Sequence, residues 1–235
     1  MREVSKSYRV GPEAVQAIRG ASLAVEPGEL AAVLGRRYEG KSTLLRLAAG
    51  LEQPDLGEVL FCGTRLDVLG RAQREALLSS RIAWVDRSDA SAGMTVAEQV
   101  TARLPGRRVR GETDARAASA LERLGCCSVA GSRWADLSRW EQLLASLAIG
   151  LASSPDLLLI DDLLGGLSRA CVQDAGQLLH RLAREADCAV LIAVDDPEAA
   201  LCADRTWSFR GGRLRPVFKA GVAEVIDFGA RQASR

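Results

Sequence analysis

Gly35-Arg-Arg-Tyr-Glu-Gly-Lys-Ser-Thr43 is the stretch that decides the fold of this chain. It matches the phosphate-binding loop pattern G-x-x-x-x-G-K-[ST], in which backbone N–H groups surround phosphates, the lysine reaches the terminal ones and the hydroxyl holds Mg²⁺. The apolar run Leu30–Leu34 predicts a buried strand before the loop, and Ser42–Ala49 predicts a helix after it. This order of strand, loop and helix is the context in which the motif binds phosphate.

The composition is that of a globular chain rather than of a nucleic-acid-binding or membrane-spanning one. The chain has 235 residues, 48% of them apolar, which suffices for one α/β domain with its own core. Lys and Arg number 31 and Asp and Glu 30, so the net charge gives no signature of nucleic-acid binding. No apolar run approaches the roughly 18 residues of a membrane span, and the cysteines lack metal-ligand spacing. We therefore expect a protein of the reducing cytosol.

Predicted strands and helices alternate along most of the chain, which is typical of an α/β fold. Besides 30–34, strands are predicted at 4–8, 18–25, 57–61, 64–66, 82–85, 157–160, 189–194, 205–209 and 214–217. Helices are predicted at 138–151, with Ser138 as N-cap, at 169–185, and from Pro197 over a short stretch. Residues 94–126 have helical spacing interrupted by glycine and proline, and we interpret them as a small helical insert.

Together these stretches resemble the nucleotide-binding subunit of ABC transporters, from about Val4 to Pro216. The resemblance is carried by the run 44–59 after the loop, by Gly93-Met-Thr-Val-Ala-Glu98, and by Leu157-Leu-Leu-Ile-Asp-Asp162 as a Walker B strand. It implies an α/β fold of the ABC ATPase type. This is a P-loop NTPase (RecA-like) core with an antiparallel β subdomain and a small helical insert. The implied single domain, 1–235, divides into a core (1–86 and 138–217), an insert (87–137) and a C-terminal tail (218–235).

The resemblance also implies a binding site for ATP and Mg²⁺. Tyr8 takes the position of the aromatic residue that stacks on adenine. The phosphates are expected to bind the loop residues Gly35, Tyr38, Glu39, Gly40, Lys41, Ser42 and Thr43. Ser42 and Asp161 are expected to hold the Mg²⁺.

Four positions depart from the family pattern where the chemistry of hydrolysis is expected. Tyr38 stands where a glycine is usual, and its Cβ obstructs close approach of phosphate. Arg87 replaces a glutamine that touches Mg²⁺ and the attacking water, although a guanidinium can pair with the γ-phosphate. Asp162 replaces the glutamate that polarises water and is one methylene shorter, where small misplacements cost much of the rate. Asp195 replaces a histidine that donates to the γ-phosphate.

The signature loop departs as well. In the family it reads Leu-Ser-Gly-Gly-Gln and contacts the nucleotide bound to the other subunit of a head-to-tail dimer; here it is Leu137-Ser138-Arg139-Trp140-Glu141. The glycines allow backbone N–H groups at a helix N-terminus to reach phosphate. Arg139 and Trp140 are expected to hold the loop away, and Glu141 brings a negative charge towards the phosphate.

Positions that hold nucleotide thus match the family, whereas those that position water and sense the γ-phosphate do not. We therefore predict an ATP-binding subunit of an ABC transporter complex that hydrolyses ATP weakly or not at all, and we leave open whether it is an enzyme. Asp162 is a weak candidate for the catalytic carboxylate, and Asp195 is expected to be non-functional at its position.

The resemblance further implies a peripheral protein on the cytoplasmic face of the membrane. Its expected partners are an integral membrane permease subunit and a second, different ABC ATP-binding subunit, with no nucleic acid. A heterodimer is favoured because a homodimer would place two altered signature loops against two nucleotides.

Other functions stay open at this point. An ATP-binding regulatory or scaffold pseudo-ATPase would control a membrane partner without transport. A working ATPase with substituted parts and a scaffold that has lost nucleotide are further alternatives. A DNA-repair or translation protein of the same family would need a long coiled-coil insert or two nucleotide domains, and this chain has neither.

Overall fold

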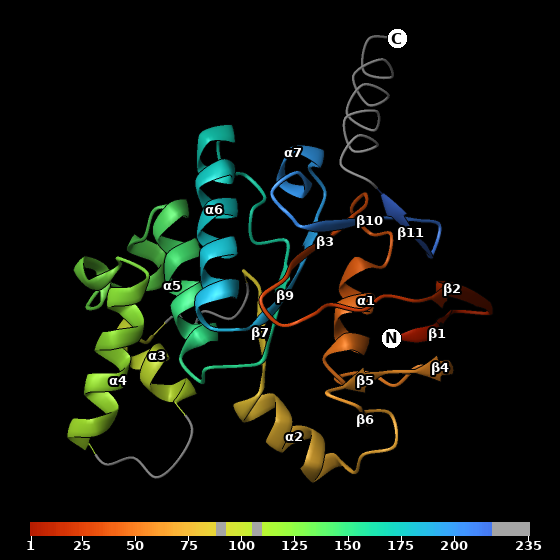
Figure 1. Ribbon diagram of the computed structural model, residues 1–235, viewed down its shortest axis with the longest axis horizontal. Coiled ribbons are helices and arrows are strands. Elements are labelled where there is room, and N and C mark those ends of the chain that lie inside the picture. Colours follow the sequence, from red (N-terminus) through yellow and green to blue (C-terminus); the bar gives the residue numbers. More distant parts are fainter. Residues whose placement is uncertain (88–92, 105–109, 218–235) are drawn as a thin grey trace.

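A six-stranded sheet lies at the centre of the computed structural model, which describes residues 1–87, 93–104 and 110–217 (Figure 1). The strand order is β11-β10-β3-β9-β8-β7, and all neighbours pair in parallel except the antiparallel β10 and β11. In that order the strands span Arg213–Val217, Arg205–Arg210, Leu30–Leu34, Ala189–Val194, Leu157–Asp161 and Ile82–Val85. The strands predicted at 30–34, 82–85 and 189–194 are confirmed with unchanged bounds.

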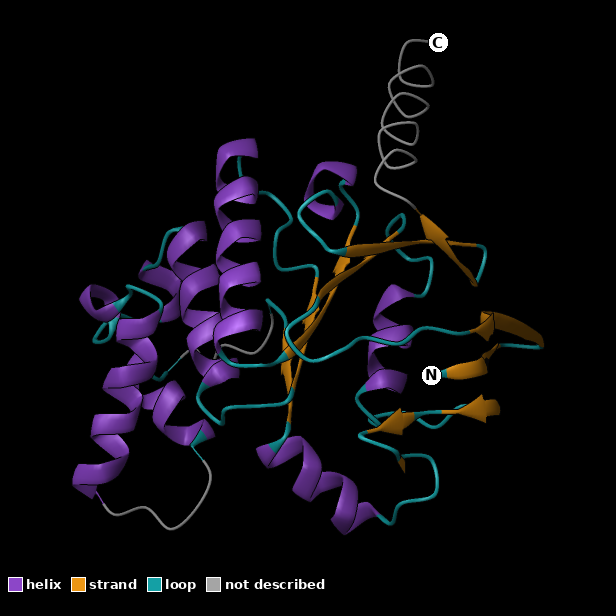
Figure 2. Cartoon of the chain, viewed as in Figure 1, coloured by secondary structure: helices purple, strands orange, loops and turns teal. Residues whose placement is uncertain are grey.

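Helices cover both faces of this sheet, which is why its central strands are apolar along their whole length (Figure 2). α5 (Arg139–Leu151) and α6 (Arg169–Glu185) lie on one face, and α1 (Lys41–Ala48) lies on the other. Successive side chains of β8 enter different cores, since Leu158 packs in the cluster with α5 and α6 whereas Leu159 packs in the cluster with α1.

A smaller antiparallel sheet lies beside α1, on the side of the molecule away from α5 and α6 (Figure 1). Its order is β2-β1-β4, with β1 at Arg2–Val10, β2 at Glu13–Ala21 and β4 at Leu56–Glu58. The hairpin of β5 (Leu60–Phe61) and β6 (Thr64–Arg65) follows. Gly57, with φ of 83°, permits the close β1–β4 contact, because an added Cβ would lie 2.5 Å from the carbonyl oxygen of Arg2.

The predicted helical insert contains α3 (Val96–Arg103) and α4 (Arg110–Arg123), followed by short 3₁₀ turns at Cys127–Val129 and Trp134–Asp136. Both helices pack on α5 and add their buried side chains to its core, which fixes the insert against the sheet. Parts of the predicted insert, 88–92 and 105–109, and the predicted tail, 218–235, lie outside the described residues.

Several predictions from the sequence differ from the structure. The strand predicted at 57–61 is divided into two, because β4 pairs with β1 whereas β5 pairs with β6. The strand predicted at 18–25 begins earlier and ends earlier as β2, because the chain pairs with β1 right up to the turn at Gly11, where φ is 62°. α2 (Arg71–Ser80) was not predicted, because only Leu77 and Leu78 pack, partly buried, against the core and most of its other residues are polar. The short α7 (Pro197–Ala200) begins at its predicted proline.

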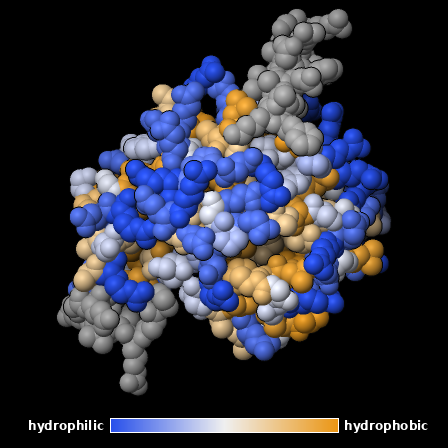
Figure 3. All heavy atoms as spheres, in the orientation of Figure 1, coloured by the Kyte–Doolittle hydropathy of each residue, from blue (hydrophilic) through white to orange (hydrophobic). Residues whose placement is uncertain are grey.

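The surface seen in Figure 3 is mostly hydrophilic, with hydrophobic residues gathered at the lower right over α2 and the β5–β6 hairpin. Val68, between β6 and α2, is an exposed member of that region. Within 1–87, 93–104 and 110–217, the helices are all too short or too polar to cross a membrane.

Candidate functional site

Four segments that carry predicted site residues meet at one edge of the six-stranded sheet. β3, β9, β8 and β7 are neighbouring parallel strands, so their carboxyl ends lie side by side. The phosphate-binding loop follows β3, and Asp195, Asp162 and Arg87 lie within two residues of the ends of β9, β8 and β7. Ligands of open α/β sheets bind outside these strand ends. The topology therefore brings together residues up to 160 positions apart.

The phosphate-binding loop is closed around Lys41. The Lys41 Nζ donates hydrogen bonds to the carbonyl oxygens of Gly35 and Arg36, at 2.7 and 2.8 Å. The Glu39 carboxylate accepts the Arg36 N–H at 2.9 Å. Gly40, with φ of 106°, turns the chain into the first turn of α1, whose N-terminus thus faces the loop. An ammonium and a helix N-terminus at one place favour an anion.

The loop keeps its glycines where space demands them. A Cβ at Gly35 would lie 2.6 Å from the backbone oxygen of Phe209, so no other residue fits there. Tyr38, which replaces a usual glycine, adopts a left-handed conformation with φ of 64°. Its side chain is fully exposed and therefore does not fill the interior of the loop.

Ser42 and Asp161, the two residues expected from the sequence to hold Mg²⁺, lie together. Ser42 hydrogen-bonds the Asp161 carboxylate from the first turn of α1. Burial raises the pKa of Asp161, the bond from Ser42 opposes that shift, and the negative charges of Asp86 and Asp162 add to it. A cation would relieve this concentration of negative charge. Among the described residues no three His, Cys, Asp or Glu side chains form a metal cluster, but Mg²⁺ commonly takes one or two carboxylates with phosphates and waters.

Tyr8 reaches the site from the antiparallel sheet. Its hydroxyl donates to the Glu52 carboxylate and lies 3.4 Å from the Thr43 hydroxyl in the first turn of α1. Burial raises the pKa of Tyr8, and the bond to Glu52 raises it further. The ring is thus fixed beside the phosphate-binding loop, and its stacking on adenine stays a prediction.

Two arginines and two aspartates form an Arg–Asp cluster at the same edge: Arg37, Arg87, Asp162 and Asp195. The Arg37 Nε lies 3.1 Å from Asp195 Oδ2, and its Nη2 lies 3.7 Å from Asp162 Oδ2. Arg87 approaches that same Asp162 oxygen at 3.7 Å and donates to the carbonyl of Gly165 at 3.3 Å. The two carboxylates at the family's catalytic positions are therefore paired with arginines.

The cluster also faces Lys41. Burial lowers the pKa of Lys41, and the negative charges that oppose this shift are, in order, those of Asp195, Asp162 and Asp161. The Arg–Asp cluster thus lies where the lysine of this motif meets the terminal phosphates. The sequence signalled Arg87, Asp162 and Asp195, but gave no signal that Arg37 pairs with them.

At the altered signature loop, the N-terminus of α5 already holds an anion. Ser138 is the N-cap, as predicted, and the Glu141 carboxylate accepts the Ser138 N–H at 2.7 Å. The reciprocal bond, from the Glu141 N–H to the Ser138 hydroxyl, completes a capping box, and these contacts lower the pKa of Glu141. Trp140 is half-buried against the core, and an added Cβ at Gly166 would lie 3.4 Å from the Arg139 guanidinium. Arg139 therefore lies against its own chain.

Comparisons with known proteins agree with this geometry. The family described as ABC transporter matches residues 18–164, which is more than half of the chain. The lipoprotein-releasing system ATP-binding protein LolD of Pseudomonas syringae pv. tomato is 33% identical over 91% of this chain and 95% of that protein. The macrolide export ATP-binding/permease protein MacB of Syntrophobacter fumaroxidans is 30% identical over 92% of this chain but only 31% of that protein.

Solved structures of ATP-binding cassettes share the fold of this chain. A dimeric ATP-binding cassette solved with ADP and Pi superimposes with a TM-score of 0.83 over 92% of this chain and 96% of that one, at 24% identity. The predicted α/β P-loop NTPase fold of the ABC ATPase type is confirmed. The family model matches more than half of the chain, and the chain is 33% identical to LolD. The chain therefore belongs to the ABC transporter family, as a nucleotide-binding subunit.

Proposed function

We propose that this chain is the ATP-binding subunit of a membrane transporter, and that it binds Mg-ATP while hydrolysing it slowly or not at all. A contrast within one site carries the proposal. The loop around Lys41 and the Ser42–Asp161 pair suit a nucleotide with its metal. The residues at the positions that polarise water and contact the γ-phosphate, Asp162 and Asp195, are instead paired with arginines.

Binding divides between the two sheets. Tyr8 stacks on the adenine from the antiparallel sheet, and the loop after β3 holds the phosphates. Ser42 and Asp161 hold Mg²⁺, which neutralises phosphate charge when bound. The phosphates are bound by Gly35, Tyr38 and Glu39 through the loop backbone, and by Gly40, Lys41, Ser42 and Thr43 at the start of α1.

Slow hydrolysis follows from the state of the two aspartates. Asp162 is one methylene shorter than glutamate, so its carboxylate is displaced from the place where a glutamate polarises the attacking water. Asp195 accepts from Arg37 and, when ionised, has no proton to donate to a γ-phosphate. The two functions expected at these positions are thus both weakened.

We further propose that the chain pairs with a different ABC subunit. A related cassette is dimeric, which supports dimerisation in general. In this chain Glu141 fills the N-terminus of α5 that would receive a partner's phosphate. Two copies would bring two such termini to two nucleotides, whereas a partner with an intact signature would complete the site of this chain.

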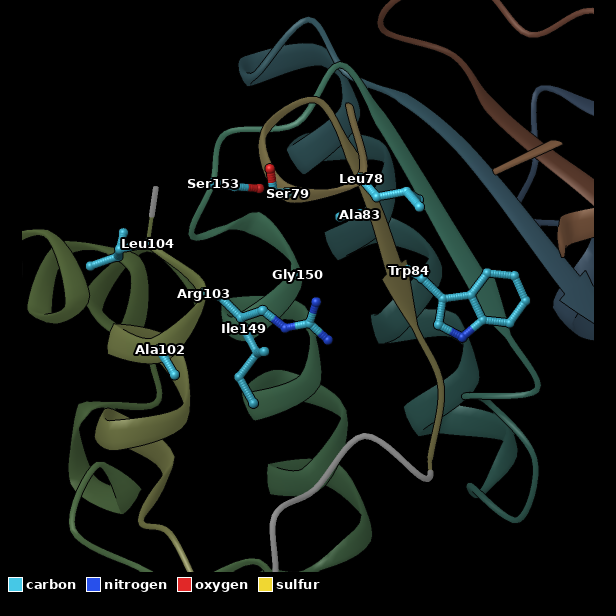
Figure 4. A pocket seen from close by; sticks show the side chains of 10 residues that line it. All are labelled: Leu78, Ser79, Ala83, Trp84, Ala102, Arg103, Leu104, Ile149, Gly150 and Ser153. Atoms are coloured by element: carbon cyan, nitrogen blue, oxygen red, sulfur yellow. The ribbon is translucent and has the colours of Figure 1, made fainter. Parts of the chain in front are cut away.

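A pocket between the insert and the sheet is the proposed seat of the permease (Figure 4). It measures about 310 Å³ and lies between α2, β7, α3 and α5. Figure 4 shows Arg103 reaching across it from the end of α3 towards β7. The MacB relative is named as ATP-binding protein and permease in one, which supports a permease partner and a position at the cytoplasmic face of the membrane.

Purification of the tagged chain from its own cells, in mild detergent with Mg-ATP, tests these proposals. We expect a membrane protein and a different ABC subunit in the complex. Ala102 is exposed on α3 and lines the pocket, so Ala102→Arg should release the membrane protein while ATP binding persists. Ala118→Arg, on the exposed side of α4, is the matched control. A complex with two copies of this chain and no membrane transporter would contradict the proposal and favour the regulatory scaffold.

A further inference from the structure

We propose that Arg37 and Arg87 form a two-guanidinium site for the terminal phosphate of a nucleoside triphosphate, which Asp162 and Asp195 occupy until the nucleotide binds. This inference rests on the proposed function, because it concerns the same site. It adds the groups by which the chain distinguishes a triphosphate from a diphosphate, and a rearrangement that follows binding.

The two arginines converge on one oxygen atom from separate segments. Arg37 comes from the loop after β3, and Arg87 follows β7 at the other side of β9 and β8. Each places a guanidinium nitrogen 3.7 Å from Asp162 Oδ2. Guanidinium groups pair with carboxylate and with phosphate oxygens through the same geometry. The Asp162 oxygen therefore holds the place that a phosphate oxygen can take.

Lys41 indicates which phosphate of the nucleotide would lie between Arg37 and Arg87. The charges of Asp195 and Asp162 act on the Lys41 ammonium more than any others do. In this loop motif the lysine contacts the terminal phosphates, so the carboxylates mark the γ-phosphate end. A diphosphate lacks the group that would extend to Arg37 and Arg87.

The charges and the exposure of the Arg–Asp cluster favour replacement of the two aspartates by a phosphate as the partner of the arginines. Together with Lys41 and Asp161, the Arg–Asp cluster carries as many positive as negative charges. An incoming phosphate upsets that balance, repels both aspartates and attracts both arginines. The cluster side chains are between 31 and 57% exposed, and ion pairs at this exposure are weak, so little opposes their replacement.

The test compares Mg-ATP with Mg-ADP on the full chain by titration calorimetry. Arg37→Ala and Arg87→Ala should each weaken ATP binding tenfold or more and change ADP binding less than twofold. Asp195→Asn frees Arg37 and removes a negative charge, so it should tighten ATP binding severalfold, a gain that misfolding cannot produce. Arg71→Ala, which removes an exposed arginine paired with Glu75 on α2, is the control and should change neither.

Unchanged ATP-to-ADP selectivity in both arginine variants, in a chain that binds ATP, would overturn this inference and leave the proposed function standing. Weaker ATP binding by Asp195→Asn would also overturn it, because the aspartate would then assist rather than compete with phosphate. If the wild-type chain binds neither nucleotide, the proposed function fails, and this inference fails with it.

Discussion

Replacing Lys41 with alanine should weaken ATP binding sharply. The Lys41 ammonium donates to two loop carbonyls, and only 8% of the residue is exposed. A phosphate replaces those carbonyls as its partner. A hydrogen bond to a charged group contributes about 1.5–3 kcal/mol, and 1.4 kcal/mol corresponds to roughly tenfold in Kd. We therefore expect Lys41→Ala to raise the Kd for Mg-ATP by about 10- to 150-fold.

The variant should remain folded. Burial of the Lys41 charge is unfavourable, as its lowered pKa indicates, and alanine removes that unfavourable burial. Calorimetry gives the Kd directly, and thermal unfolding gives an independent measure. ATP at 100 times its Kd should stabilise the wild type by about 2.7 kcal/mol, and a tenfold weaker site by roughly half of that. Arg71→Ala serves as the control. If the folded variant binds ATP within twofold of the wild type, the loop is not the nucleotide site.

Three further variants test the site and the fold. Glu141→Gln with Arg139→Gly removes the negative charge and the long side chain at the N-terminus of α5 without losing the capping box, so it should raise the ATPase rate of the native complex. An unchanged rate in an intact complex would show that the signature does not limit turnover. Asp162→Glu with Asp195→His restores the length of the carboxylate at 162 and a hydrogen-bond donor at 195, and should raise ATP hydrolysis by this chain at least tenfold. Continued inactivity with ATP bound would refute the claim that these two positions limit hydrolysis. Gly150→Ala should lower the free energy of unfolding, measured in urea, by about 1–3 kcal/mol, because the new Cβ would lie 2.4 Å from a methyl group of β7. This overpacking outweighs the roughly 1 kcal/mol gain in helix propensity. Equal or higher stability would mean that α5 can shift away from the sheet.

Much of the fold was predictable because its core elements leave strong local signals. β3, β7 and β9 are short apolar runs bounded by polar residues, and α6 has a clear apolar stripe, so their predicted bounds hold. α2 left only a weak signal, because Leu77 and Leu78 are its only residues that pack, partly buried, against the core. β2 was misplaced because its bounds depend on pairing with β1, which local periodicity does not report.

The candidate site divides in the same way. The loop around Lys41 is a contiguous motif, and the sequence alone identifies it. The contact of Arg37 with Asp195 is different, since 158 residues separate the two and only the pairing of β3 with β9 brings them together. The return of Glu141 to Ser138 depends on a side-chain conformation at a helix start, where the sequence predicted only its charge.

Hydrolysis of Mg-ATP by the purified chain tests the central claim most directly. The protein is loaded with γ-labelled ATP, freed of unbound nucleotide, and the released phosphate is counted over time. Because Asp162 is one methylene shorter than the usual glutamate and Asp195 replaces a histidine donor, we expect the bound nucleotide to remain ATP over many minutes, at a rate far below the usual enzyme range of ~1–10³ s⁻¹. Turnover within that range, abolished by Lys41→Ala, would contradict the account.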